Sequence, residues 1–526
     1  MKIESYKMKK IWGIVMLCAV AASATAVPAR REAQVRTAAD GTEKIVYQNG
    51  DETFHYLTDA EGRWLDEETL MPMSEEVKQS KVESQKTKAK AKVRRMKEET
   101  GTDRLLSPRG AVILVSYQDL AFQQTNADMT AWAMGETYTY NGATGSIHQY
   151  FYDQSWGQYD MEIDVYGPVT VSRNASYYGS NDWNGDDQHP DQLVKEACQL
   201  AHNECGADFS KYDSDGDGKV DWVVILYAGK GEADGGASTT IWPHQYELSY
   251  TGMDFQLDGK TVDHYCCLNE IDGQTGERCG IGTFCHEFSH VMGLPDFYAT
   301  NQAGHRTMGS WDIMDYGPYN NDGNTPPNYS AYERWFMGWI EPTLLNTACS
   351  VTLPPLQDSK AACVLTETGQ GISNILQPLP STFYLLENRQ QEGWDTYLKG
   401  SGMMVTKVQW SKSKWANNTV NNTSTSLGID IQEARANTSS YSDKATDLFP
   451  KGSTQFLKMD NYHVTNIVMD NRIITFDVND GGQMIVLEVG NVQSDDVQCT
   501  KVLYNGQVYI LRDGKIYDLF GRKISE

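Results

Sequence analysis

The sequence predicts an α/β central domain that follows a β-rich region and precedes a domain of short strands. Residues 108–345 alternate apolar runs of strand length with segments of helical spacing. Residues 27–107 begin with paired strand and turn signals, and residues 346–480 contain short strands between turns. The chain has 526 residues, of which 40% are hydrophobic, so it can bury more than one core. We therefore expect several packed domains around a central α/β domain.

Residues 1–26 are predicted to be a secretory signal peptide. Basic residues at the start precede a mostly apolar run from Ile11 to Ala21, and small residues end the segment. The run is too short to span a bilayer, and no later stretch is long and apolar enough to do so. Cys18 is an alternative lipid-attachment site, but residues 15–17 fit a lipoprotein signal poorly. We expect a bacterial protein that is secreted or displayed at the cell surface, without a transmembrane segment.

The charge of the chain argues against nucleic acid as a partner. Removing residues 1–26 takes away four lysines and one glutamate, which changes the formal net charge from −25 to −28. Affinity for phosphates comes from clustered lysine and arginine, so a strongly acidic chain is an unlikely partner of nucleic acid.

Nine cysteines remain after residues 1–26 are removed. The four nearest the central motif could form disulfides or remain buried thiols, namely Cys266, Cys267, Cys279 and Cys285.

Residues 27–107 are predicted to be a propeptide with a basic linker. An Asn49-Gly50 turn between two strand-like runs predicts a hairpin, and Asp59 to Gly62 predicts a second turn. From Glu75 to Lys97 the sequence is almost wholly polar and rich in basic residues, which indicates a solvated helix or a disordered linker. An exposed basic segment suits cutting by an activating protease. A permanent spacer is the alternative.

The central region, residues 108–345, is predicted to alternate strands and helices. Strands are expected at 111–116 and 220–228, and helices at 191–205, 282–292 and 329–339.

A metal-binding pattern begins at His286. His286 and His290 are four residues apart, so on a helix both imidazoles lie on one face, and Glu287 lies beside them as a candidate general base. Gly293 can adopt a positive φ, end the helix and bring Asp296 back toward the histidines. This H-E-x-x-H-x-x-G-x-x-D spacing is the arrangement of metzincins and predicts a zinc site formed by His286, His290 and Asp296.

Two later residues fit the same arrangement, and one offers an alternative. Met314 follows Asp296 at the distance of a metzincin Met-turn, and Tyr316 is a candidate for stabilising an oxyanion. Glu333, on the helix expected at 329–339, would be the third ligand if the site were thermolysin-like. Its long separation from His290 makes it the weaker candidate.

An Asp-rich loop predicts a structural calcium site. Carboxylates alternate along it, Gly218 stands at the sharp turn, and Val224 at the twelfth position excludes an EF-hand. An empty Asp/Gly turn is the alternative. The candidate calcium residues are Asp213, Asp215, Asp217, Lys219 and Asp221.

The C-terminal part is predicted to contain only β structure. Short strands over residues 346–480 predict one β-sandwich, interrupted by a polar insert at 411–425 that is expected to be a mobile loop. Residues 481–526 alternate apolar residues between turn signals, which predicts a β-meander tail.

Several of these segments together resemble the immune inhibitor A family of secreted metallopeptidases, over roughly residues 40–480. The resemblance rests on I-G-T-F-C-H-E-F-S-H-V-M-G-L-P-D-F-Y, D-S-D-G-D-G-K-V-D-W-V-V-I-L-Y-A-G, I-W-P-H, S-W-D-I-M-D-Y-G and Y-L-L-E-N-R-Q-Q-E-G-W-D. It implies a zinc endopeptidase made as a zymogen, with structural calcium and a β-sandwich behind the catalytic domain. Cys285 directly before His286 departs from the family pattern. The propeptide has no cysteine, so a thiolate from it cannot cap zinc.

The expected function is zinc-dependent hydrolysis of protein or peptide substrates by a monomer. Zinc supplies an acidified water and polarises the scissile carbonyl, and Glu287 moves the proton. The alternative is an inactive, metal-bearing adhesion or glycan-binding protein whose β domains carry the function.

Overall fold

The structure, a computed structural model, describes residues 27–38, 40–52, 54–89, 108–182, 185–301, 303–436 and 442–487, and short strands between Cys499 and Ser525. The predicted signal peptide and the second part of the basic linker, residues 90–107, lie outside the described residues. Residues up to Leu487 form one compact unit and Glu488–Glu526 form another.

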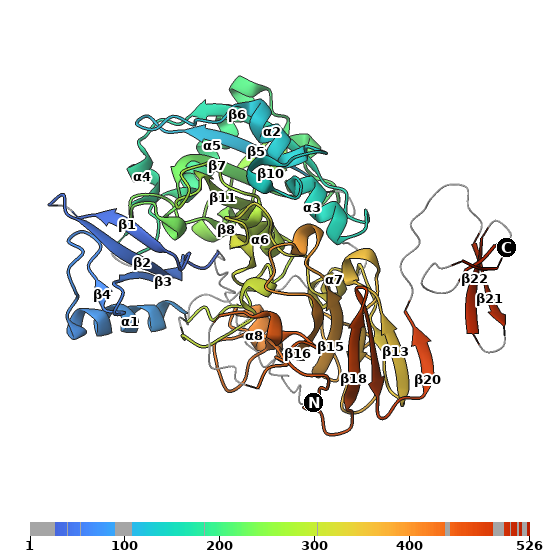
Figure 1. The fold of residues 1–526 in the computed structure, drawn as a ribbon. Coiled ribbons are helices and arrows are strands. Elements are labelled where there is room, and N and C mark those ends of the chain that lie inside the picture. Colours follow the sequence, from blue (N-terminus) through green and yellow to red (C-terminus); the bar gives the residue numbers. More distant parts are fainter. Residues whose placement is uncertain are drawn as a thin grey trace, which may run out of the picture. The chain divides into compact units, whose positions relative to one another are not determined.

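The first unit is mixed α/β and contains a five-stranded sheet, which lies in its upper part in Figure 1. Four strands are parallel, and the edge strand β8 runs antiparallel to β11. Residues 111–115 and 223–228 are fully or almost fully buried, which explains their continuous apolar sequence. The strands in spatial order are β6 (Glu162–Thr170), β5 (Arg109–Ser116), β7 (Val223–Lys230), β11 (His264–Ile271) and β8 (His244–Glu247).

Helices pack on this central sheet. The helix α5 (Pro190–Cys205) contacts β5, β6 and β11, and its buried residues recur at helical spacing. It starts with proline and stops at Gly206, whose φ is +72°. The remaining helices of this part are α2 (Asn126–Met134), α3 (Ile147–Gln154), α4 (Ala175–Gly179), α6 (Gly282–Val291) and α7 (Ala331–Phe336). A two-stranded sheet joins β9 (Gln256–Leu257) to β10 (Lys260–Thr261).

The N-terminal region is a four-stranded antiparallel sheet followed by a helix. Its hairpin differs from the predicted one, because Gly50 lies inside β2 opposite His55 and the turn comes after Asp51. The second predicted turn, from Asp59 to Gly62, is present. The elements are β1 (Ala33–Thr37), β2 (Glu43–Asp51), β3 (Phe54–Thr58), β4 (Trp64–Leu65) and α1 (Glu75–Ala89).

Residues 343–486 form two further sheets whose buried apolar side chains share one cluster. One sheet has the order β12 (Thr343–Leu344), β14 (Cys363–Leu365), β15 (Thr382–Arg389), β16 (Gly402–Gln409) and β17 (Ile429–Ile431). The other has the order β18 (Val464–Asp470), β19 (Ile473–Val478), β13 (Cys349–Leu353) and β20 (Gln483–Val486). Because β20 pairs with β13, this region extends to Leu487 and beyond the predicted boundary at residue 480.

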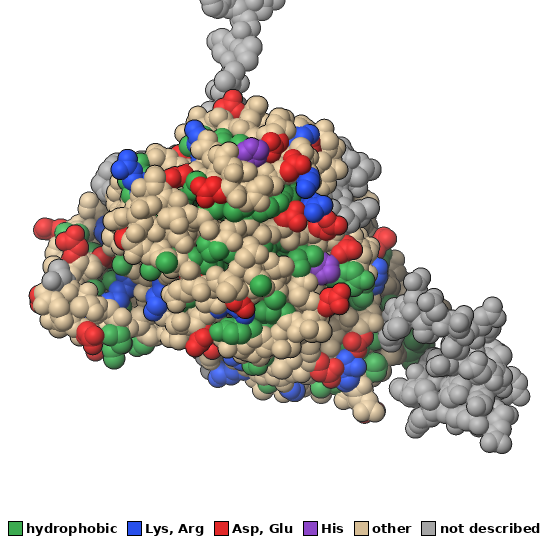
Figure 2. Space-filling model, turned by 90° about the horizontal axis from the view of Figure 1, so that it is seen from above, with side chains coloured by type: hydrophobic (Ala, Val, Ile, Leu, Met, Phe, Trp, Pro, Cys, Tyr) green, Lys and Arg blue, Asp and Glu red, His purple; other side chains and the backbone are tan. Residues whose placement is uncertain are grey.

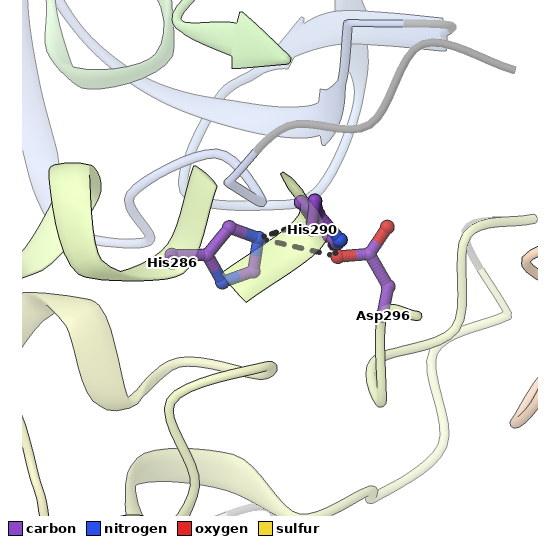
Figure 3. A group of neighbouring side chains, drawn as sticks. All are labelled: His286, His290 and Asp296. Atoms are coloured by element: carbon purple, nitrogen blue, oxygen red, sulfur yellow. Dashed lines mark hydrogen bonds and ion pairs between the residues drawn. The ribbon is translucent and has the colours of Figure 1, made fainter. Parts of the chain in front are cut away.

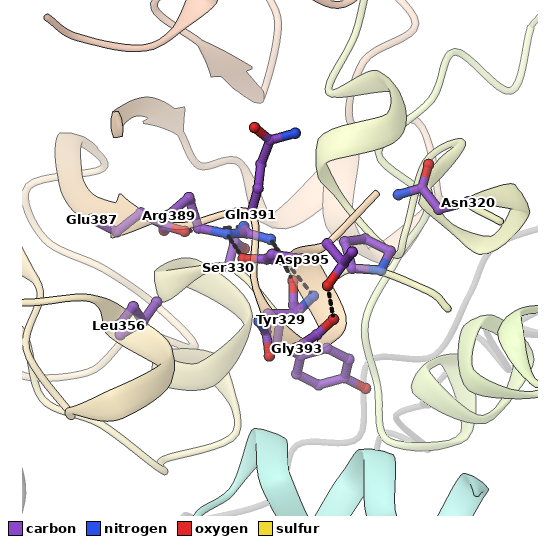
Figure 4. Close-up of polar contacts among 12 residues, drawn as sticks. Asn320, Tyr329, Ser330, Leu356, Glu387, Arg389, Gln391, Gly393 and Asp395 are labelled. Atoms are coloured by element: carbon purple, nitrogen blue, oxygen red, sulfur yellow. Dashed lines mark hydrogen bonds and ion pairs between the residues drawn. The ribbon is translucent and has the colours of Figure 1, made fainter. Parts of the chain in front are cut away.

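A buried ion network joins β15 to the segment before α7 (Figure 4). The guanidinium of Arg389 donates to Asp395 at 2.7 Å and to Glu387 at 3.2 Å, and these three side chains are 1% exposed. The carboxylates in turn accept the backbone N–H groups of Asn328 and Ala331. The motif Y-L-L-E-N-R-Q-Q-E-G-W-D therefore has a structural role, since it fastens the C-terminal sheets to the α/β part.

The second unit is a four-stranded antiparallel sheet of consecutive strands. They are β21 (Cys499–Tyr504), β22 (Gln507–Arg512), β23 (Lys515–Tyr517) and β24 (Lys523–Ser525).

No helix among the described residues combines the length and apolar character needed to cross a membrane. Acidic and basic side chains are interspersed on the face drawn in Figure 2.

Candidate metal centre

The helix α6 carries both histidines of the motif and is buried over most of its length. It packs against β11 and β8, and it approaches the loop around Pro318 so closely that a Cβ on Gly282 would lie 2.0 Å from the Pro318 carbonyl oxygen. The helix ends at Val291, and Gly293 follows with φ at +103°. A side chain at Gly293 would be strained in this left-handed conformation, so glycine is required where the chain turns back.

The turn brings three ligand atoms together (Figure 3). His286 Nε2 lies 3.1 Å from His290 Nε2 and 3.2 Å from Asp296 Oδ1. His290 Nε2 lies 3.1 Å from the same oxygen of Asp296. All three residues are buried. Ligand atoms about 2.0–2.1 Å from a tetrahedral zinc ion are about 3.3 Å apart, so this triangle has the size of one face of such a site.

Backbone carbonyls orient the two imidazoles. His286 Nδ1 lies 2.7 Å from the Ile313 oxygen, and His290 Nδ1 lies 2.8 Å from the Leu294 oxygen. In a neutral imidazole the Nδ1–H donates to such a carbonyl, which leaves the Nε2 lone pair free. Both Nε2 lone pairs then point into the same small space beside a carboxylate, an arrangement that suits a bound cation.

The predicted Met-turn lies beneath α6. Met314 is fully buried, and its carbonyl oxygen accepts the backbone N–H of Phe297, next to Asp296, at 2.7 Å. The preceding carbonyl, from Ile313, is the one that orients His286. Met314 therefore belongs to a turn that contacts the motif at two places.

Asn418 holds Asp296 in place, and sequence reasoning missed it. Its amide nitrogen donates to Asp296 Oδ2 at 2.5 Å, and its amide oxygen accepts the Asp296 backbone N–H at 2.7 Å. The polar insert that carries Asn418 was expected to be a mobile loop, but it contains α8 (Lys412–Ala416) and the buried residues Trp415 and Val420. These anchors fix the insert against the metal motif, and a motif search could not have found a partner 122 residues away.

The network around Asp296 sets its charge. Burial raises the pKa of Asp296, but the His290 and His286 rings lower it more, and the net pKa is well below its ordinary value. The opposite holds for Glu287, because burial and the nearby Asp296 carboxylate raise its pKa well above the ordinary value.

Glu287 lies on α6 beside the histidines and makes a contact with the N-terminal region. Its Oε1 accepts the backbone N–H of Val27 at 2.7 Å. Tyr316 follows the Met-turn, and the guanidinium of Arg31 lies 3.8 Å from the centre of its ring. Burial raises the pKa of Tyr316 to about 12, so the phenol keeps its proton at neutral pH. Residues 27–31 therefore cover both candidate catalytic side chains.

Glu333, the alternative third ligand, lies elsewhere. Its carboxylate accepts the backbone N–H of Ser330 at 2.6 Å and the Ser330 hydroxyl at 2.9 Å in a capping box at the start of α7. The helix itself is shorter than predicted, spanning Ala331–Phe336. Among the described residues, the cluster with His286 and His290 contains Asp296 and not Glu333.

The Asp-rich loop brings three of its carboxylates together. Asp213, Asp215 and Asp217 form a candidate cation group, with positive φ at Gly216 and Gly218. Asp221 instead accepts from the Ser214 hydroxyl at 2.5 Å. The side chain of Lys219 points to Asp263, at 3.2 Å, and Lys260 Nζ lies 2.5 Å from Asp213 Oδ2. The ammonium of Lys260 therefore already neutralises part of the loop's charge.

Another group joins the N-terminal sheet to the α/β part. His55, on β3, places Nε2 3.2 Å from Glu232 Oε1 and Nδ1 3.2 Å from the Asp51 carbonyl oxygen. Its ring stacks on Trp242 with centroids 4.8 Å apart. Burial lowers the pKa of His55, but the Glu232 carboxylate outweighs this and raises it to about 9. Both ring nitrogens therefore face acceptors, as an imidazolium requires.

The cysteines near the motif are thiols. All eight cysteines whose side chains are described are free, including Cys266, Cys267, Cys279 and Cys285. Burial raises the pKa of Cys285 well above its ordinary value, which keeps this thiol neutral beside the motif.

Comparison with known proteins agrees with the geometry. Residues 114–340 match the catalytic domain of the immune inhibitor A peptidase M6 family. Over 222 residues the chain is 29% identical to Immune inhibitor A of Bacillus thuringiensis subsp. alesti, covering 36% of this chain and 31% of that protein. Over 249 residues it is 28% identical to Pre-pro-metalloprotease PrtV of Vibrio cholerae serotype O1 (strain M66-2), covering 42% of this chain and 26% of that protein.

The matches span less than a third of the length of either relative. The family match covers a narrower part of the chain than the expected 40–480, and it contains the metal motif, the Asp-rich loop and the Met-turn. Residues 114–340 thus form a domain that matches the catalytic domain of the immune inhibitor A (M6) family of peptidases.

Proposed function

We propose that the protein is a secreted, zinc-dependent endopeptidase of the metzincin type, made as a zymogen. The observation that carries this proposal is the triangle of His286, His290 and Asp296, whose ligand atoms lie 3.1–3.2 Å apart. These three residues would hold zinc, which would supply an acidified water and polarise the scissile carbonyl. The match to a peptidase catalytic domain and the name of the relative Pre-pro-metalloprotease PrtV support the same function.

Glu287 is the proposed general base. Its carboxylate is buried on α6 beside the proposed zinc ligands, which places it to take and return a proton. The carboxylate would take the proton of the attacking water and deliver it to the leaving amine, and one backbone nitrogen, that of Val27, lies within hydrogen-bond distance of it. Tyr316, protonated because of its raised pKa, would donate a hydrogen bond to the oxyanion once Arg31 has left its ring.

The N-terminal region is proposed to keep the enzyme latent. If the signal peptide is removed after Ala26, Val27 is the first residue of the exported chain, and its nitrogen lies at Glu287. Trp242 Nε1 donates to the Val27 carbonyl oxygen at 3.2 Å, and Arg31 covers Tyr316. A peptide substrate needs the same space. Cutting within about 94–109 by an activating protease would release the propeptide, residues 27–107.

Three further assignments remain proposals. The loop of Asp213, Asp215, Asp217, Lys219 and Asp221 is proposed to bind structural calcium, supported by its three converging carboxylates. The two sheets that share a core over residues 346–480 are proposed to be a β-sandwich domain. The sheet of β21 to β24 is proposed to be a separate C-terminal tail, and the enzyme is proposed to be a monomer.

The deciding experiment compares the activated wild type with Glu287→Gln. The variant should retain stoichiometric zinc, because its ligands are intact, and should lose peptide hydrolysis by at least about a thousandfold, because proton transfer is lost. Mass spectrometry of a peptide library, with and without chelator, measures the cleavage. If the wild type cleaves no peptide in a chelator-sensitive way, the alternative of an adhesion or glycan-binding protein replaces this proposal.

A further inference from the structure

Arg30 of the N-terminal region fills an acidic pocket of the catalytic domain. Its Nη1 lies 2.6 Å from Asp272 Oδ2, and its Nη2 lies 2.5 Å from Asp322 Oδ1. The side chain is 3% exposed, and the ring of Tyr319 lies 5.7 Å from its guanidinium carbon. Arg30 is therefore held by two carboxylates of the catalytic domain and an aromatic face, and its Nε lies 3.4 Å from the carboxylate of Glu32 in its own segment.

The pocket is built from separate segments of the catalytic domain. Asp234 ends a short 3-10 helix at Glu232–Asp234, Asp272 directly follows β11, and Asp322 lies in the loop after Tyr319. Asp234 is buried and accepts the backbone N–H of Gly273 at 3.0 Å. Burial and the neighbouring Asp272 raise the pKa of Asp234 to about 7, which reflects how closely the acids are gathered.

Three main-chain groups of the segment are held by catalytic-domain groups that could bind any peptide, whereas the Ala29 N–H donates to Gly50 of the N-terminal sheet at 2.7 Å. The Val27 carbonyl oxygen accepts from Trp242 Nε1, and the Pro28 carbonyl oxygen accepts from the Tyr319 hydroxyl at 2.7 Å. The Arg30 backbone N–H donates to the Ala233 carbonyl oxygen at 3.0 Å. These three contacts are made by main-chain groups and do not depend on which side chains the peptide carries.

The contact with Glu287 fixes the register of this segment. A general base that returns its proton to the leaving amine lies beside the nitrogen of the first residue after the scissile bond. Val27 has its nitrogen in that position, 2.7 Å from Glu287 Oε1. Counting along the chain, Arg30 occupies the place of the fourth residue after the bond.

We propose that Asp234, Asp272 and Asp322, with Tyr319, form a substrate subsite that accepts an arginine or lysine at the fourth residue after the scissile bond. This inference rests on the proposed peptidase function and names a class of substrate for it. The propeptide would then hold its place by imitating a preferred substrate.

The charge balance of the pocket gives the physical reason. Once Arg30 leaves, the buried residues Asp234 and Asp272 lose their cation, as does Asp322, whose side chain is 56% exposed, and buried charges without a partner are costly. The other cation near Asp234 is Lys230, whose Nζ donates to the Gly273 carbonyl oxygen at 2.9 Å on the exposed rim. A basic substrate side chain would restore the balance. Arginine should be favoured over lysine, because its two terminal nitrogens reach two different carboxylates.

The test uses the enzyme activated by proteolysis and two peptides that differ in one group. They carry arginine or its neutral isostere citrulline at the fourth residue after a common cleavage site. The arginine peptide should have a kcat/KM at least tenfold higher. Asp322→Asn and Asp272→Asn should bring the ratio below threefold, since asparagine keeps the shape and tolerates the positive φ of 50° at Asp322. The control Glu204→Gln, an exposed change at the end of α5, should keep the tenfold ratio.

A binding measurement separates the pocket from the chemistry. Calorimetry uses the activated protein, treated with chelator, and the product-like peptides Val-Pro-Ala-Arg and Val-Pro-Ala-citrulline. The arginine peptide should bind at least tenfold more tightly than the citrulline peptide. Asp322→Asn should remove this difference. Equal binding of the two peptides by the wild type, or a difference that persists in both aspartate variants, would overturn the subsite. If no peptide is cleaved but the calorimetric difference is intact, the peptidase proposal fails and the pocket's preference for a basic side chain stands.

Discussion

Asn418 and Asp296 are joined by two reciprocal hydrogen bonds although 122 residues separate them in the chain. The contact fixes one carboxylate oxygen of Asp296 and leaves the other facing the two histidines. The C-terminal part of the chain thus takes part in shaping the candidate metal site on α6.

The first prediction concerns this support. Asn418→Gly should weaken zinc binding by about ten- to a hundredfold, because loss of a residue that orients a metal ligand lowers metal affinity by about that factor. Glycine is chosen because Asn418 has a φ of +53°, which alanine would strain. Competitive zinc titration measures the effect. The control is Asn422→Ala in the same insert, whose side chain bonds Thr300 rather than Asp296. Zinc affinity that stays within twofold in the glycine variant would mean that Asn418 only anchors its loop.

The second prediction separates the two candidate third ligands. Asp296→Ala should lower zinc occupancy and activity by at least about tenfold, as loss of a ligand does. Glu333→Gln should keep its zinc, because its carboxylate caps α7 through Ser330. Metal analysis of both purified variants provides the measurement. Zinc lost from the Glu333 variant and retained in the Asp296 variant would remove the metzincin assignment.

The third prediction concerns calcium. If the Asp-rich loop binds calcium in the folded state, the melting temperature of calcium-stripped protein should climb as calcium is added, because binding to the native state alone stabilises it. Asp215→Asn should flatten this response, since Asp215 belongs to the group of converging carboxylates. Glu204→Gln, an exposed change at the end of α5 and outside the group of converging carboxylates, is the charge-matched control. A flat response of the wild type would mean an empty loop.

The fourth prediction concerns latency. The intact exported chain should hydrolyse peptides at least about tenfold more slowly than the chain cut within 94–109, because Val27 and Arg31 cover Glu287 and Tyr316. Replacing Arg31 by alanine uncovers Tyr316 without changing the catalytic domain and should raise the activity of the intact chain. Progress curves before and after cutting measure both effects. Equal rates for intact and cut wild type would make residues 27–107 a spacer or a folding aid.

The fifth prediction concerns pH. The pKa of His55 is raised from 6.5 to about 9 by Glu232, so its contribution to stability is complete below 6.5 and is lost as pH rises through 9. Glu67, Asn181 and Asp187 also surround the His55–Glu232 pair. Thermal unfolding of the intact chain should therefore show a loss of stability between pH 7 and 10 that His55→Gln abolishes. The same loss in His55→Gln would assign the effect to other groups.

Local spacing was enough to predict most of the candidate metal site. His286, His290, Gly293 and Asp296 lie within eleven residues, where helical periodicity and the positive φ of one glycine decide which side chains meet. The two strands and three helices predicted in the α/β part are present, because continuous apolar runs and helical spacing indicate burial. The strands β6, β8 and β11 and the helices α2, α3 and α4 were not predicted. The hairpin register was not predicted correctly. Asn49 and Gly50 pair with residues of β3 instead of forming the turn, and the chain turns only after Asp51.

The sequence by itself determined which residues could bind a metal, because their ligand atoms are brought together by one helix and one turn. Only the tertiary structure decided what surrounds them: the Ile313 carbonyl on His286, Asn418 on Asp296, Val27 on Glu287 and Arg30 among three aspartates. The partners in these contacts are separated by 27 to 292 residues, and several are backbone groups that every residue type possesses. Such contacts depend on how whole elements pack, so no local pattern in the chain encodes them.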